Sequence, residues 1–139
     1  MKLHSKKGFT LIEMLVVIAI IAILVAVIVP TVTTATAKAK AATDAANLRA
    51  VAAEIAIDWL DNGKIDGTYT ADFKSKSGTT TIEAYETNNE IQAFYKNGDA
   101  LYGVKDLSDA AQDGKLDSTS TAPSGTGVTQ IVSGGAAKT

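Results

Sequence analysis

The sequence predicts an α+β fold in which a long N-terminal α-helix packs on a small antiparallel β-sheet. An uncharged, mostly apolar run extends from Met14 to Ala37, and apolar residues then recur at spacings of three and four. Short β-rich runs, separated by turn residues, begin at Thr79. These patterns are typical of a membrane-inserted helix, an amphipathic helix and antiparallel strands, respectively.

The first element is a helix over residues 9–34, which follows a basic leader over residues 1–8. About 20 apolar residues cross a bilayer core of roughly 30 Å, and residues 9–34 contain such a stretch. Positively charged flanks stay on the cytoplasmic side, and the leader carries three lysines, Lys2, Lys6 and Lys7. Glu13 is the one charged residue in this helix. Because a carboxylate in lipid is costly unless it is paired, Glu13 is a candidate functional residue.

The helix is expected to continue over residues 35–61 as an amphipathic half, because no loop signal follows Pro30. One face of this half is predicted to be apolar, with Ala41, Ala45, Leu48, Ala52, Ile55 and Trp59. A polar stripe is predicted beside it, with Lys40, Asp44, Asn47, Glu54, Asp58 and Asp61. The many alanines here favour helix formation and allow close packing of helices. Asp61-Asn-Gly63 is expected to end the helix, since glycine is common just after a C-terminus.

Residues 35–139 are expected to form a globular head. Residues 61–78 are predicted to be a connecting loop, because they combine three glycines with many polar residues. A β-sheet region is predicted over 79–132, with strands at 79–85, 90–95, 100–104 and 128–132. The turns are expected at Asn88-Asn89 and Asn97-Gly98. The run 90–95 is also compatible with a short helix, and the remaining Ser/Thr/Gly-rich stretches between Ser118 and Thr139 are expected to form a flexible tail.

The segment from Lys6 to Pro30 resembles the N-terminus of type IV prepilins and the related pseudopilins. It combines a basic leader ending in Gly8, an aromatic Phe9, Glu13 four positions later, a long β-branched apolar helix, and Pro30 where the family usually has a proline. The resemblance implies that a prepilin peptidase cuts between Gly8 and Phe9 and methylates the new Phe9 amine. A conventional secretory signal peptide or a plain membrane anchor would explain the hydropathy, but neither accounts for Glu13 or for Gly-Phe at the boundary.

Two departures from the family pattern bear on the subtype. Many pilins have a glycine eight residues before the proline, where this chain has Ala22. Many pilins of Gram-negative bacteria close their C-terminal region with a disulfide, and this chain has no cysteine. The resemblance therefore points to pilins of Gram-positive bacteria or to major pseudopilins.

Composition argues against catalysis and against nucleic-acid binding. The only histidine, His4, lies in the leader, and there is no cysteine or nucleophile-elbow motif. The formal net charge is −2, and removal of the three leader lysines leaves 10 basic and 15 acidic residues, a net charge of −5. An acidic chain is poorly suited to neutralise phosphates. No cofactor is expected, and the candidates for oxygen ligands of Ca²⁺ are turn carboxylates: Asp58, Asp61, Asp66 and Asp117.

Self-assembly is the function that these residues support best. Glu13 is expected to lack a partner within its own helix, so that the Phe9 amine of a neighbouring subunit neutralises it. The predicted protein is the structural subunit of a type IV pilus, a homo-polymer whose assembly depends on Phe9, Glu13 and Pro30. The precursor would be a single-pass protein in cytoplasmic membrane lipid and would meet the prepilin peptidase and the assembly machinery before it reaches a surface filament. A secretion or competence pseudopilin and a monomeric membrane-anchored binding module remain the alternatives.

Overall fold

The computed structural model describes residue 8, residues 10–65 and residues 67–138. The chain divides into two compact units, one ending at Thr34 and one beginning at Ala35. Predictions that concern residues 1–7, Phe9 and Asp66 lie outside the described residues. The expected α+β class is confirmed, because a long N-terminal helix packs on a five-stranded antiparallel sheet.

Helix α1 extends from Leu11 to Asn62 and includes Pro30 in its interior. It ends where the sequence predicts, since the Gly63 N–H donates to the Trp59 carbonyl at 2.9 Å and Gly63 has a φ of 60°. Pro30 has no N–H to donate within the helix. The Pro30 carbonyl accepts hydrogen bonds from the hydroxyls of Thr33 at 2.9 Å and Thr34 at 3.2 Å.

The sheet has the strand order β3-β2-β1-β4-β5, and all neighbours are antiparallel. Its strands are β1 (Thr80–Thr87), β2 (Glu90–Asn97), β3 (Ala100–Tyr102), β4 (Val128–Ser133) and β5 (Ala136–Ala137). The run 90–95 is therefore a strand and not a short helix. Asn88 and Asn89 both have positive φ, 52° and 64°, as a two-residue type I′ turn requires.

Helix α2 (Val104–Asp113) was not predicted. The third strand was expected to extend to Val104, but it stops at Tyr102, and Val104 begins the helix. The Asp106 carboxylate accepts the Gly103 N–H at 2.8 Å at the start of α2, and Gly114 closes the other end with a φ of 80°. Gly, Asp and Gly at these positions are ordinary helix boundary signals.

Strand β5 lies in a segment for which the sequence predicted a flexible tail. Gly134 and Gly135 have positive φ and connect it to β4. Tyr69, from the predicted connecting loop, donates its N–H to the Gly135 carbonyl at 2.7 Å. A Cβ at Gly135 would lie 2.9 Å from the Tyr69 carbonyl oxygen, so the contact requires glycine.

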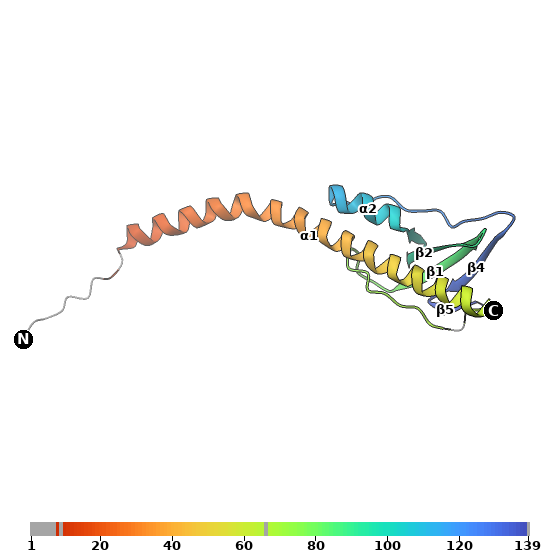
Figure 1. Cartoon of the computed structure of the whole chain (residues 1–139). Helices are drawn as coiled ribbons and strands as arrows, with labels where there is room; N and C mark the ends of the chain where they lie inside the picture. The colour runs from red at the N-terminus through yellow and green to blue at the C-terminus, as the bar shows by residue number, and fades with distance from the viewer. Residues whose placement is uncertain (1–7, 9, 66, 139) are drawn as a thin grey trace, which may run out of the picture. The chain divides into compact units, whose positions relative to one another are not determined.

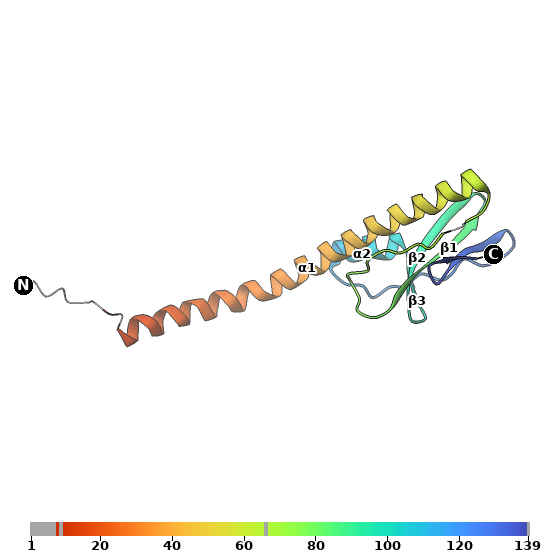
Figure 2. The same cartoon turned by 90° about the horizontal axis from the view of Figure 1, so that it is seen from below.

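The core of the head lies between α1 and one face of the sheet (Figures 1 and 2). Leu48 and Ile55 of α1 pack with Ile82, Tyr95 and Val132, all fully buried. A smaller cluster on the opposite face joins three side chains: Tyr85, Phe94 and Leu101.

Asp44 does not belong to an exposed polar stripe, which is a correction to the predicted polar face of α1. Its side chain is buried, and its carboxylate accepts the N–H of Lys74 at 2.7 Å and the N–H and hydroxyl of Ser75 at 2.8 and 2.5 Å. The predicted apolar face is confirmed, with Ala41, Ala45, Leu48 and Ile55 buried and Ala52 and Trp59 half-buried.

Candidate assembly site

Glu13 lies in the first turn of α1 and forms a capping box with Thr10. The Thr10 N–H donates to the Glu13 carboxylate at 2.8 Å, and the Glu13 N–H donates to the Thr10 hydroxyl at 3.3 Å. Glu13 thus has a hydrogen-bond partner just before α1, whereas the expectation that no cation within its own helix pairs with it stays a prediction. The Thr-x-x-Glu spacing before an apolar run is the sequence signal that predicts this arrangement.

The capping box brings no positive charge to Glu13, because Thr10 is neutral. No salt bridge within the described part of the chain involves Glu13. An ionised carboxylate has about four acceptor positions, and the Thr10 N–H uses one of them. The carboxylate is exposed and remains available to a cation from another molecule.

Gly8, the residue before the predicted cut, is exposed, and a Cβ built there would meet no atom of the described residues within 4 Å. A side chain at Gly8 is therefore compatible with the fold of the chain itself. Phe9, which would provide the methylated amine, lies outside the described residues.

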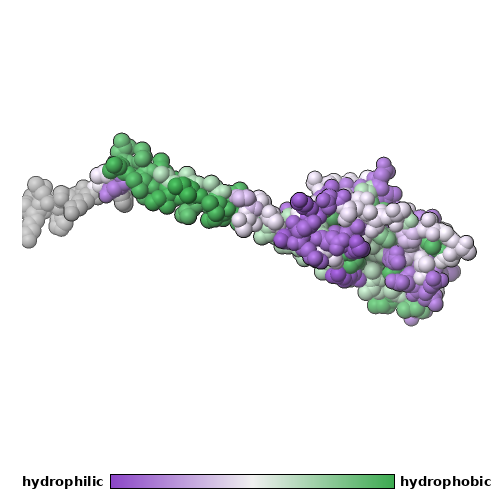
Figure 3. Space-filling view, turned by 90° about the horizontal axis from the view of Figure 1, so that it is seen from above, coloured by the Kyte–Doolittle hydropathy of each residue, from purple (hydrophilic) through white to green (hydrophobic). Residues whose placement is uncertain are grey.

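Every large apolar side chain between Leu11 and Val32 is exposed, for example Ile18 at 62% and Ile23 at 66%. Figure 3 shows this part of α1 as an almost continuous hydrophobic surface. Among the described residues, α1 is the one helix that is long and apolar enough to cross a membrane. Since water would penalise so much exposed apolar area by about 25 cal/mol per Å², the segment is suited to lipid or to packing against other helices.

Asp58, Asp61 and Asp117, the described carboxylates among the predicted calcium ligands, do not form a group that could hold a metal ion. Asp58 accepts the Tyr69 hydroxyl at 2.6 Å, and Asp61 and Asp117 are exposed. Asp66 lies outside the described residues. No group of three or more His, Cys, Asp or Glu side chains within residues 10–65 and 67–138 is arranged to hold a metal ion. Calcium binding stays a prediction.

A polar network lies on the sheet face opposite α1. The buried Glu83 carboxylate accepts the Tyr85 hydroxyl at 2.9 Å and the Lys96 ammonium at 3.0 Å. Burial, the hydrogen bond to Glu83 and its negative charge raise the pKa of Tyr85 to about 12. Burial and the negative charges of Asp44 and Asp72 also raise the pKa of Tyr95. Sequence reasoning missed this network, because strand alternation places Glu83 and Tyr85 on one face but does not show that the face is covered.

Comparison with known proteins identifies the N-terminal segment. Residues 3–29 match the prokaryotic N-terminal methylation motif, the class III leader of type IV pilins and pseudopilins. No curated protein and no solved structure matches the chain. The motif implies a membrane-anchored precursor that a prepilin peptidase processes and an assembly machinery handles. The N-terminal segment therefore carries the methylation motif of type IV pilins and pseudopilins, and this motif supports a type IV pilin-like or pseudopilin protein.

Proposed function

We propose that this protein is the major pilin of a type IV pilus, a structural subunit that polymerises with copies of itself into a surface filament. The observation that carries the proposal is the position of Glu13. It is a charged residue at the start of a helical segment whose large apolar side chains are all exposed, and its only described contacts are with Thr10.

The charge of Glu13 favours assembly in a defined register. Cleavage after Gly8 would create an ammonium group at Phe9, and the carboxylate of a neighbouring copy can accept it. Removing two ions from water costs several kcal/mol per ion, which is offset only when the ions meet. The pair therefore penalises wrong registers more than it stabilises the right one.

The filament would consist of bundled apolar helices that carry heads on the outside. Before assembly, the precursor would remain in the membrane with its leader on the cytoplasmic side. The proposed role requires no catalytic group and no cofactor.

The test combines mass spectrometry of the mature protein with electron microscopy of the cells. We expect a chain that begins at N-methylated Phe9, and long surface fibres that consist of this chain. A processed chain that forms only short periplasmic or wall-embedded assemblies would indicate a pseudopilin. A processed chain that stays monomeric in the membrane would indicate a binding module, and an intact leader would contradict the whole assignment.

Gly8→Val is the matched control for processing. Because a Cβ at Gly8 meets none of the described residues within 4 Å, this variant should fold normally but obstruct the close approach of the peptidase that glycine permits. We expect an uncut, membrane-bound precursor on an immunoblot and no fibres. Recovery of normal mature protein from Gly8→Val would show that the cut lies elsewhere.

A further inference from the structure

Two large apolar side chains on the head stay exposed at the end of α1. Ile57 is 65% exposed and Leu60 is 77% exposed, and no other large apolar side chain of the head is as exposed among its described residues. Both lie on the face of α1 that points away from the core residues Leu48 and Ile55. Glu54 and Asp61 are exposed beside them. We call Ile57, Leu60 and Asp61 the knob.

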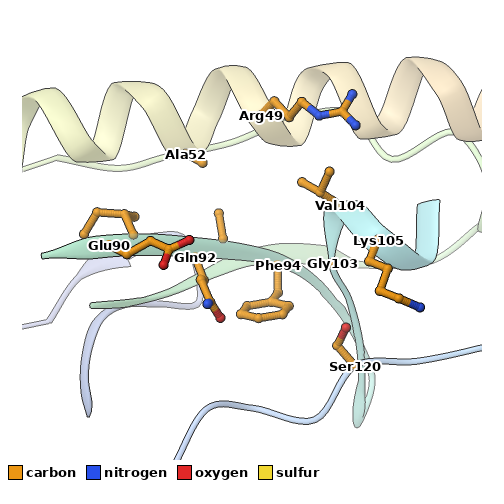
Figure 4. Close-up of a pocket in the computed structure, with 11 residues that line it drawn as sticks. Arg49, Ala52, Glu90, Gln92, Phe94, Gly103, Val104, Lys105 and Ser120 are labelled. Atoms are coloured by element: carbon orange, nitrogen blue, oxygen red, sulfur yellow. The ribbon is translucent and has the colours of Figure 1, made fainter. Parts of the chain in front are cut away.

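The head also contains a pocket of about 400 Å³ between α1, β2 and the start of α2. Figure 4 shows Ala52 of α1 and Val104 of α2 facing this space above the sheet. Ile91 and Ala93 of β2 complete its apolar lining. The pocket persists because β3 pairs only with residues 95–97 of β2, so residues 90–94 have no strand on that side.

The charges of the knob and the pocket are complementary. Arg49 and Lys105 lie at one end of the pocket, and Glu90 lies at the other end (Figure 4). Arg49 donates one hydrogen bond, to the Ser108 hydroxyl at 3.1 Å, and a guanidinium has five donors. It can therefore also bind a carboxylate of an incoming molecule, such as Asp61.

We infer that the knob of one copy docks in the pocket of a second copy, with Ile57 and Leu60 against the apolar lining and Asp61 beside Arg49. This inference rests on the proposed filament function and specifies a contact between heads. Because the knob and the pocket are different surfaces of one chain, the contact is heterologous, and such contacts continue into an open helical fibre. Leu60 follows Ala52 by eight residues and Asp61 follows Arg49 by twelve, so parallel copies in contact would be offset by about 12–18 Å along α1.

Cysteine cross-linking tests the contact directly, because the chain has no cysteine of its own. The variant carries Leu60→Cys in the knob and Ala52→Cys in the pocket. Within one chain these residues are about 12 Å apart along the helix, beyond the roughly 7 Å between Cα atoms that a disulfide allows. Every disulfide must therefore join two copies.

Mild oxidation of fibres from this variant should give a ladder of covalent oligomers on a non-reducing gel, since each copy contributes one knob and one pocket. The matched control pairs Leu60→Cys with Ala122→Cys, another half-buried alanine, which packs against the cluster on the opposite sheet face. If fibres of the variant give no more covalent oligomers than fibres of this control, the inference is wrong and the proposed function still stands. Covalent dimers alone would also overturn it, because they indicate a two-fold contact. If the unmodified chain forms no fibres, both proposals fail.

If the cysteine variant does not assemble, exchanging the charges of Arg49 and Asp61 tests the same contact. We expect Arg49→Glu to reduce the number of fibres at least about tenfold, equivalent to about 1.4 kcal/mol, and Arg49→Glu with Asp61→Arg to restore it. The control is Arg49→Glu with Asp99→Arg, which has the same net charge and also loses the Ser108 hydrogen bond. Because Asp99 lies in the turn before β3 and not in the knob, we expect the number of fibres to stay low in this control. Equal fibre numbers for the two double variants would refute the docking.

Discussion

At the scale of single residues, Glu13 has a local role in the first turn of α1 and, as we propose, an intermolecular role in assembly. Its bond from the Thr10 N–H satisfies a backbone donor at the start of α1, and its charge remains for a partner. A neutral acceptor at this position would preserve the first role and weaken the second. The two roles are therefore separable by substitution.

Glu13→Ala should leave cleavage after Gly8 largely intact but abolish or strongly reduce fibres. Removing one partner of a buried ion pair costs on the order of 3–5 kcal/mol, because the Phe9 ammonium of the neighbour would be left unpaired. Glu13→Gln keeps the acceptor for the Thr10 N–H and should fail less completely. Immunoblots of the mature chain and fibre counts by electron microscopy measure both effects. If cells whose only copy of this protein is Glu13→Ala make normal fibres, the proposed pairing of Glu13 with the Phe9 ammonium of a neighbour is wrong.

Asp44 should be the most sensitive carboxylate for the stability of the head. Asp44→Ala would leave the N–H groups of Lys74 and Ser75 without their acceptor. Hydrogen bonds to charged groups contribute about 1.5–3 kcal/mol each, so we expect the free energy of unfolding to fall by about 3 kcal/mol. Urea unfolding of the detergent-solubilised chain, followed by the fluorescence of Trp59, the single tryptophan, measures it.

Asp61→Ala is the control for Asp44→Ala, because Asp61 is exposed and such surface changes usually stay within about 0.5 kcal/mol. Asp44→Asn should be intermediate, since the amide oxygen still accepts one of the bonds. If Asp44→Ala and Asp61→Ala unfold at the same urea concentration, the Asp44 contacts contribute nothing to stability.

At the scale of elements, the hairpin of β1 and β2 organises the sheet, since it pairs all eight residues of each strand in register. Its two-residue turn requires left-handed backbone at Asn88 and Asn89. Asparagine tolerates this conformation better than other residues with a side chain, and β-branched residues tolerate it worst.

Asn89→Val should therefore lower the free energy of unfolding by about 1–2 kcal/mol, whereas Asn89→Gly should leave it unchanged or raise it slightly. The φ of Asn89 is 64°, which glycine adopts without strain. Thermal unfolding by circular dichroism distinguishes the two variants. Equal melting temperatures would show that the turn does not limit stability.

At the scale of the whole molecule, tyrosines on both faces of the sheet link stability to alkaline pH. The pKa of Tyr85 is raised from 10.0 to about 12 in the folded chain. Because the unfolded chain loses this proton first, the folded state binds more protons between these values, and stability falls as pH rises. The contribution of Tyr85 is fully present below about pH 10 and is lost as pH rises through the folded value.

We expect the urea midpoint of the full chain to decrease from about pH 9 upward and to decrease less steeply in Tyr85→Phe. The comparison is between slopes, because Tyr85→Phe also removes the hydrogen bond to Glu83 and lowers stability at neutral pH. Tyr95 should contribute in the same direction. Identical slopes for the unmodified chain and Tyr85→Phe above about pH 10 would contradict the raised pKa of Tyr85.

Sequence patterns correctly predicted the long helix, its apolar N-terminal half and the hairpin at Asn88-Asn89, and they also predict the cut after Gly8. These features depend on local rules: hydropathic length, helix periodicity, a motif at fixed spacing and the backbone preference of turn residues. Local signals also explain the capping box of Thr10 and Glu13 and the boundaries of α2.

Four features depend on the folded chain: the burial of Asp44, the covered network of Glu83 and Tyr85, the pairing of β5 with β4, and the pocket beside β2. Each depends on segments that are distant in the chain, such as the loop at Lys74 and Ser75 that reaches Asp44. Helix periodicity assigns Asp44 to a face of α1, but whether that face meets water or a loop donor depends on the path of residues 63–79. The physical reason is that a buried polar group is stable only where distant donors converge on it, and no local pattern records that convergence.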